Sequence, residues 1–229
     1  MRIHHYISRS GHISRRTVKR LIDSGEITVN GVPCDHNTQV LEGDEVLVSG
    51  QPLPEREAPV YLALNKPVGV TCTAAGHVEN NIIDFVNYPT RIFAVGRLDK
   101  ASEGLILLTN DGQIVNKMMR SEHGHEKEYR VTVNKPVTDE FLQTMAEGVE
   151  IMNTWTKPCI TSRLGENEFR IVLTQGMNRQ IRRMSKALGY RVERLERVRI
   201  MNITLDGLPQ GEWRYLHPDE LELLLEQLG

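Results

Sequence analysis

The residue best suited to chemistry in this sequence is Asp99, which lies in a short polar loop between two apolar runs. The loop also carries Arg97 and Lys100, two cations that favour the charged form of a neighbouring carboxylate. Leu98 and Leu105 flank the carboxylate and would help to keep water away from it. Since loops held by rigid strands commonly carry reactive groups, Asp99 is a candidate reactive carboxylate.

A turn explains Asp99 equally well from these residues alone. An aspartate in a turn hydrogen-bonds to its own backbone, and Gly96 also fits a turn. A glycoside hydrolase would need a second positioned carboxylate, and nothing recommends the nearby Glu103 for that role. This stretch therefore leaves a turn residue and a reactive carboxylate open.

The elements that must position Asp99 are two apolar runs at residues 92–95 and 105–109, which have the length of buried strands. They would mount the loop 96–104 between them. Along the rest of the chain strands predominate, helices are interspersed irregularly, and no βαβ repeat is present. This pattern predicts an α+β fold with a mainly antiparallel, mixed sheet and flanking helices.

Basic residues are concentrated in two places, although the net charge of the 229-residue chain is only −2. The first 22 residues contain six Lys and Arg side chains and no acid, whereas residues 23–55 contain acids and neither Lys nor Arg. Residues 170–199 hold nine basic residues against two glutamates. Such local asymmetry is typical of a phosphate-binding surface, with a solvated charged surface as the alternative.

The first basic cluster falls on an expected helix, which Ser14 is suited to cap and Gly25 to end. Two of its cations lie in the first turn, where the helix dipole disfavours them unless an anion offsets the cost. The cations of this helix are Arg15, Arg16, Lys19 and Arg20. The dipeptide Asn30-Gly31 then predicts a two-residue hairpin, so about 50 residues form a compact module.

The second cluster falls on another expected helix, capped by Asn178 and ended by Gly189. Its cations recur at the i, i+3, i+4 and i+7 positions of one face, namely Arg179, Arg182, Arg183 and Lys186. An exposed charged face is one interpretation. We favour a phosphate-binding face with one arginine directed at a carboxylate.

Several classes of protein are disfavoured by the sequence. No apolar run approaches the roughly 20 residues that span a bilayer, and the N-terminus lacks the apolar core of an export signal. The sequence has three widely spaced cysteines and no CxxC pair: Cys34, Cys72 and Cys159. This pattern favours a reducing cytoplasm and argues against a structural zinc site. His123 and His125 have no third metal ligand nearby, so no metal is expected.

Residues 1–52 resemble the small RNA-binding module named after a small-subunit ribosomal protein. The matching residues are Tyr6-Ile7, Gly11, Ser14-Arg15-Arg16, Leu21-Ile22, Gly25, Val29-Asn30-Gly31 and Gly43-Asp44. In that family the basic helix lies against structured RNA. The proline-rich, charged stretch at 53–59 is then a linker, and a second domain spans 60–229.

Three stretches of the second domain, GRLDKASEGLILLTNDG, KEYRVTV and QGMNRQIRRM, resemble the motifs of the pseudouridine synthases of the RsuA/RluB/RluE/RluF group. Their order matches, the basic module precedes them as in that group, and the details look closest to the RluF type. The resemblance covers nearly the whole chain. It implies a catalytic domain that isomerises uridine to pseudouridine in RNA without a cofactor.

The resemblance also implies roles for individual residues. Asp99 matches the catalytic nucleophile, Tyr129 the tyrosine that packs against the base, and Arg182 the arginine paired with the catalytic carboxylate. Arg97 matches a residue that helps to hold the flipped uridine. The expected RNA-binding residues are Arg97, Arg15, Arg16, Lys19, Arg20, Asn178, Arg179, Gln180, Arg183 and Lys186.

The expected partner is ribosomal RNA, most simply that of the large subunit, with tRNA as a further substrate. We expect a cytoplasmic monomer, since no apolar interface stripe stands out and no membrane segment is visible. A non-catalytic RNA-binding or ribosome-assembly factor is the alternative. It would use the basic module in the same way but would form no product.

Overall fold

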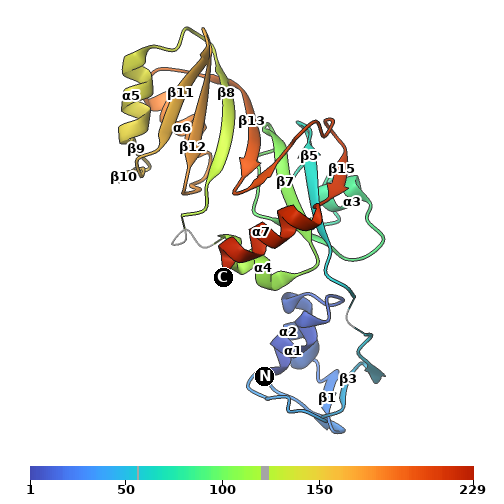
Figure 1. Ribbon diagram of the computed structural model, residues 1–229. Coiled ribbons are helices and arrows are strands. Elements are labelled where there is room, and N and C mark those ends of the chain that lie inside the picture. The colour runs from blue at the N-terminus through green and yellow to red at the C-terminus, as the bar shows by residue number, and fades with distance from the viewer. Residues whose placement is uncertain (56, 120–123) are drawn as a thin grey trace. The chain divides into compact units, whose positions relative to one another are not determined.

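The computed structural model describes residues 1–55, 57–119 and 124–229 and divides into two compact units (Figure 1). The first unit comprises Met1–Val60 with the turn Asn110–Gly112. The second comprises Tyr61–Thr109 and Gln113–Gly229. In the described part of the chain no helix has the length and apolar character needed to cross a membrane.

The first unit packs two helices against a small antiparallel sheet with strand order β2-β1-β3-β4. Its elements are α1 (Ile3–Arg9), α2 (Arg15–Asp23), β1 (Ile27–Val29), β2 (Val32–Pro33), β3 (Val46–Val48) and β4 (Gln51–Pro52). Their apolar side chains form a core of this unit's own, which includes Ile3, Ile7, Val18, Ile22 and Ile27.

Local signals in the sequence set the ends of these elements. The Ser14 hydroxyl accepts a hydrogen bond from Thr17 N at 3.1 Å and caps α2, as predicted. The helix ends at Asp23, and Gly25, whose φ is +71°, turns the chain just after it. Asn30 and Gly31 both have positive φ and join β1 to β2, which confirms the predicted hairpin.

The second unit is built on one mixed sheet, whose main path through the described residues runs β11-β12-β8-β13-β7-β5-β15. Strand β6 also pairs with β7, and β14 with β13. Among the described residues the strands of this sheet pair antiparallel except β7 with β13, which confirms the predicted mainly antiparallel fold. The strands are β5 (Tyr61–Lys66), β6 (Phe93–Val95), β7 (Glu103–Thr109), β8 (Lys127–Val133), β11 (Ile160–Gly165), β12 (Glu168–Leu173), β13 (Val192–Ile200), β14 (Ile203–Thr204) and β15 (Trp213–Tyr215).

The second unit contains two hydrophobic core clusters. Helices α5 (Asp139–Glu147) and α6 (Gln180–Ala187) pack against β8 and β12, and the β-ribbon of β9 (Glu150–Ile151) and β10 (Thr154–Trp155) lies at the end of α5. Helices α4 (Gly112–Met119) and α7 (Pro218–Leu228) lie side by side and pack against β5 and β7 (Figure 1). The short helix α3 (Ile82–Val86) is capped by its preceding residue, Asn81.

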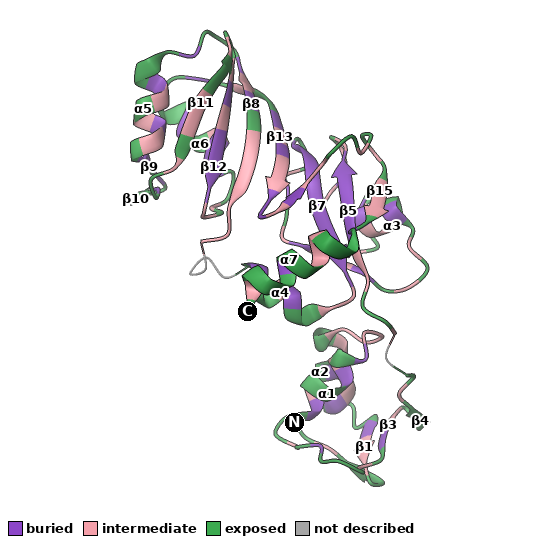
Figure 2. Cartoon of the chain, viewed as in Figure 1, coloured by how far each residue is buried: buried purple, intermediate pink, exposed green. Residues whose placement is uncertain are grey.

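Strands β5 and β7 form the most buried part of the second unit (Figure 2). Every residue of β7 is buried, and β5 is buried from its second residue onward. The loop that carries Asp99 therefore ends in a rigid, solvent-free strand, as the apolar run at 105–109 predicted.

Two predicted boundaries are wrong. Strand β7 begins at Glu103, so the loop is 96–102 rather than 96–104; Gly104 lies in the strand because its backbone pairs with Arg197. The residue preceding helix α6 is Arg179, with a φ of +51°, rather than Asn178. The Asn178 side chain instead accepts a hydrogen bond from Arg183, which removes it from the capping position.

Candidate active site

A cavity of about 410 Å³ lies in the second unit where its two core clusters meet. Val95, Met118 and Ile200 line it from one cluster, and Leu173 and Leu195 from the other. The cavity brings together six of the residues that the sequence singled out: Arg97, Asp99, Tyr129, Asn178, Arg179 and Gln180.

The carboxylate of Asp99 lies at the cavity wall, with 28% of its side chain exposed. The guanidinium Nη1 of Arg179 lies 3.5 Å from its Oδ2. The carbonyl of Asp99 accepts a hydrogen bond from Ser102 N at 3.0 Å, so the backbone forms a turn. The chain thus turns at Asp99 through a backbone hydrogen bond, and the carboxylate faces a cation in a cavity, whereas its reactivity stays a prediction.

The arginine that faces Asp99 differs from the one implied by the resemblance. Arg182 does not line the cavity; its Nη2 donates to Ala101 O at 2.9 Å and its Nη1 to Val192 O at 3.1 Å. Burial and the nearby Arg179 lower the pKa of Arg182, whereas Asp99 acts in the opposite direction. In the described structure it is Arg179, the left-handed residue just before α6, that pairs with the carboxylate, while the role implied for Arg182 stays a prediction. Arg182 instead ties the Asp99 loop to β13.

The turn after β5, residues 66–70, also holds the loop that carries Asp99. Lys66 is fully buried, and its ammonium donates to Pro67 O at 2.8 Å and Val70 O at 2.9 Å, which fixes a turn. Gly69 N in that turn donates to Lys100 O at 2.8 Å. Burial lowers the pKa of Lys66 because the charged ammonium loses its hydration. Sequence reasoning missed this lysine, since an Asn-Lys-Pro turn carries no sign that its ammonium is enclosed.

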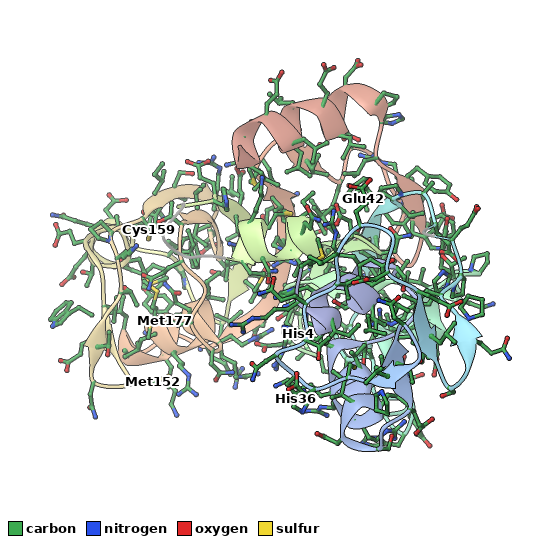
Figure 3. All side chains as sticks on the ribbon, turned by 90° about the horizontal axis from the view of Figure 1, so that it is seen from below. His4, His36, Glu42, Met152, Cys159 and Met177 are labelled. Carbon is green, nitrogen blue, oxygen red and sulfur yellow. The ribbon has the colours of Figure 1, made fainter. Side chains whose placement is uncertain are left out.

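Tyr129 lies on β8 and supplies an aromatic wall of the cavity. It pairs with Ile171 on one side and with Arg197 on the other, so its backbone is held by two neighbouring strands. The ring packs against the same core cluster as Met177 and Cys159, two side chains labelled in Figure 3. Burial raises the pKa of the Cys159 thiol to about 11, which marks this cluster as apolar. An apolar, rigid wall beside an aromatic ring suits a stacked base.

The other basic residues singled out by the sequence lie elsewhere. Arg183 and Lys186 are exposed on α6 and do not line the cavity. The pKa of His4 in the first unit is lowered by burial, by the adjacent His5 and then by nearby cations that include Lys19, which shows a concentrated positive field. The basic residues of α2 are exposed on that unit: Arg15, Arg16, Lys19 and Arg20.

Two further cations line the cavity, Lys127 on β8 and Arg197 on β13. Burial and the Arg197 guanidinium lower the pKa of Lys127. The sequence held a signal for the position of these two cations. Side chains alternate along a strand, so Lys127 lies on the same face as Tyr129, and Arg197 on the same face as Leu195. Among its lining residues the cavity thus holds four cations, Arg97, Lys127, Arg179 and Arg197, and one carboxylate, Asp99.

The described residues contain no group of His, Cys, Asp and Glu side chains arranged to hold a metal ion. His125 lines the cavity, and His123, the other histidine of that stretch, lies outside the described residues. The chemistry available in the cavity is that of a carboxylate, a phenol and several cations. This set suits nucleophilic attack and binding of a polyanion.

Comparison with known proteins agrees with this geometry. Residues 60–187 match the RNA pseudouridylate synthase family, and residues 1–46 match the S4 domain. The chain is 52% identical to the dual-specificity RNA pseudouridine synthase RluF of Escherichia coli O157:H7, over 96% of this chain and 77% of that protein. It is 34% identical to the ribosomal large subunit pseudouridine synthase B of Bacillus subtilis, over 97% and 95% of the two chains.

A solved structure extends the likeness to three dimensions. The crystal structure of a pseudouridylate synthase superposes with a TM-score of 0.72 and 29% identity, and the match covers 98% of this chain and 99% of the other. The fold, the sequence motifs and the cavity therefore agree. The chain belongs to the RNA pseudouridine synthase family and carries an N-terminal S4 domain.

Proposed function

We propose that this protein converts specific uridines in structured RNA to pseudouridine, with Asp99 as the nucleophile. The observation that carries the proposal is the placement of Asp99, Arg179 and Tyr129 around one cavity. Its volume of about 410 Å³ lies within the range of small-molecule sites, about 300–1,000 Å³. A nucleotide flipped out of its stack would fill such a site.

The reaction needs no atom beyond those of the uridine and the enzyme. Asp99 attacks C1′ of the ribose, and the C1′–N1 bond breaks with its electron pair moving into the uracil ring. The ring turns, C5 bonds to C1′, and Asp99 leaves with its bonding electrons. C5 then loses its proton to a base, for which the Tyr129 oxygen is the candidate, and N1 takes up a proton. Arg179 pairs with the Asp99 carboxylate, and Arg182 holds the loop that presents it.

The surrounding cations have a separate role in this proposal. Arg97 is exposed at the cavity and would hold the phosphate backbone next to the flipped uridine. The basic helix α2 of the first unit would bind a structured part of the same RNA. Base contacts in the cavity and phosphate contacts around it would together select the target.

We further propose ribosomal RNA, in the first place that of the large subunit, as the substrate, with tRNA as a second. The names of two relatives, a dual-specificity RNA pseudouridine synthase and a large-subunit synthase, support this choice. The protein would act in the cytoplasm, where its substrate is made and its three free cysteines stay reduced. We propose that it acts as a monomer.

The experiment is pseudouridine mapping of rRNA and tRNA after incubation with the purified protein. We expect Asp99→Asn to abolish product while RNA binding and the melting temperature stay unchanged, because only the nucleophile is lost. Asp139→Asn is the matched control, since Asp139 is 97% exposed and pairs with Arg163 away from the cavity. A non-catalytic binding factor would give no product with either form, and a hydrolase would release free uracil; both results would contradict the proposal.

A further inference from the structure

Arg197 is the least exposed of the charged residues around the cavity. It lies on β13 with 3% of its surface exposed, between two strands that both contribute to the site. Its Cα pairs with Tyr129 of β8 on one side and with Gly104 of β7 on the other. The backbones of Gly104 and Arg197 lie close together. A Cβ on Gly104 would lie 2.6 Å from Arg197 N and nearer still to its carbonyl oxygen.

The hydrogen bonds of Arg197 are incomplete. Its Nε donates to Leu105 O at 2.7 Å, which fixes the guanidinium against β7. Its Nη2 is buried and has no hydrogen-bond partner among the described residues. A buried donor without a partner costs free energy, and for a charged group the cost is larger. Such a group in a native structure calls for an explanation, and at the wall of a cavity a ligand can supply the missing acceptor.

Arg199, on the same strand, shows that the fold can supply hydrogen-bond acceptors to an arginine in this region. The guanidinium of Arg199 donates to Glu126 at 2.8 Å, to Glu128 at 2.9 Å and to Met201 O at 2.8 Å. Arg197 donates to neither carboxylate, and its charge helps to lower the pKa of two lysines, Lys127 and Lys66. An anionic group in the cavity would therefore be stabilised by Arg197 rather than by a partner within the fold.

The reaction generates such a group. When the C1′–N1 bond breaks, the electron pair stays on the uracil and the negative charge spreads over N1 and the O2 and O4 carbonyl oxygens. We propose that Arg197 is a catalytic residue, whose buried Nη2 donates to a carbonyl oxygen of the target uracil and stabilises this charge. The proposal rests on the proposed function. A fixed, desolvated donor suits this role, because it needs no reorganisation as the charge develops.

The first test compares Arg197→Met and Arg197→Lys with the control Arg199→Met in single-turnover pseudouridine formation. We expect Arg197→Met to lower the rate constant by about 100-fold or more, the usual effect of removing one preorganised donor. Arg197→Lys keeps the charge and should retain an intermediate rate. Arg199→Met removes an arginine of the same strand outside the cavity, so its rate constant should match that of the wild type.

A structural role for Arg197 gives a different result. Melting temperatures and the folded fraction are therefore measured for each variant, and rates are expressed per folded molecule. A fall in stability with an unchanged rate per folded protein would overturn the proposal. So would a rate loss in Arg199→Met as large as that in Arg197→Met.

The second test asks whether the contact is to the base. RNA with 2-thiouridine or 4-thiouridine at the target position replaces one carbonyl oxygen by sulfur, a weaker hydrogen-bond acceptor. If Arg197 donates to that oxygen, the thio substitution slows the wild type but has little further effect on Arg197→Met, a non-additive cycle. Fully additive effects for both thiouridines would exclude the base contact. Wild-type protein that forms no pseudouridine would refute the proposed function itself, whereas active wild type with normal Arg197 variants would refute only this inference.

Discussion

The two arginines near Asp99, the proposed nucleophile, have different tasks, although they are three residues apart on one basic stretch. Arg179 reaches the Asp99 carboxylate, whereas Arg182 donates to Ala101 O in the loop and Val192 O in β13. The first pairs with the carboxylate of the proposed nucleophile. The second acts on its position.

Substitution should separate these two tasks. Arg182→Lys cannot span both carbonyls with one ammonium, so the loop shifts and we expect kcat to fall by about 10- to 100-fold with RNA affinity unchanged. Arg179→Met removes a cation that is 48% exposed, and we expect both weaker RNA binding and a lower kcat. Single-turnover rates and filter-binding titrations measure the two effects. Normal activity in Arg182→Lys would refute the positioning role.

At the scale of elements, the site depends on the close approach of β7 and β13. Gly104 has a φ of +100° and faces the Arg197 backbone, so any side chain there is both strained and obstructed. We expect Gly104→Ala to lower the free energy of unfolding by at least about 2 kcal/mol, the size of a strained backbone position plus a displaced strand. Denaturant unfolding measures this loss.

Gly76→Ala is the matched control for that experiment. Gly76 lies in the same unit, its φ is not positive, and nothing lies within 4 Å of where its Cβ would be. Its substitution should change stability by no more than about 0.5 kcal/mol. Equal effects of the two substitutions would show that β7 and β13 tolerate a wider spacing.

A charged network ties β8 to its two neighbours. Arg170 of β12 donates to both oxygens of Glu128 at 2.6 and 2.9 Å, and this bond, with a smaller contribution from Arg199, lowers the pKa of Glu128. Since the folded pKa is below the unfolded value, this stabilisation is present at neutral pH. It is lost as the pH falls through the folded pKa.

Arg170→Met should therefore destabilise the protein in a pH-dependent way. We expect a loss of about 1–2 kcal/mol at pH 7, typical of hydrogen bonds to a charged, partly exposed group. The loss should shrink below about pH 4, where the glutamate becomes protonated. Urea unfolding at several pH values measures it, with Arg191→Met as control because that arginine pairs with Glu193 in an exposed bridge. A pH-independent loss would point to packing instead of charge.

The sequence predicted these elements well wherever the signal was local. Ser14 caps α2 as expected, because a cap depends on a few adjacent residues, and Thr138 and Pro218 begin α5 and α7 by the same kind of local signal. The partner of Asp99 was missed because it depends on the left-handed backbone of Arg179, which no neighbouring residue indicates. Arg197 was missed because its burial results from pairing with β7, a strand more than 90 residues earlier. Long-range register is not encoded in any short window.

At the scale of the whole molecule, RNA affinity should be shared between the cavity and the basic helix of the first unit. Arg15 and Arg16 are exposed in the first turn of α2, where the helix N-terminus also favours an anion. We expect Arg15→Gln with Arg16→Gln to weaken RNA binding and to reduce the slope of log Kd against log salt by about 1 for each lost phosphate contact. The single-turnover rate at saturating RNA should stay unchanged.

The control for this effect removes the same charge elsewhere. Lys135→Gln with Arg191→Gln neutralises two exposed cations of the second unit that do not line the cavity. Titrations at several salt concentrations compare the two double variants. Equal losses of affinity and slope would mean that only the net charge matters and that helix α2 makes no specific contact.

The pairing of β7 with β13 has a consequence for the folding of the protein during synthesis. It is a parallel pairing with two register pairs, Glu196 with Glu103 and Arg197 with Gly104, and it joins segments far apart in the chain. The Asp99 loop lies on one side of it, whereas Tyr129 and Arg179 lie on the other. Because long loops close slowly, these halves should meet late in folding. A nascent chain would carry the proposed nucleophile long before the rest of the site is in place, so we expect no activity until the ribosome has completed β13.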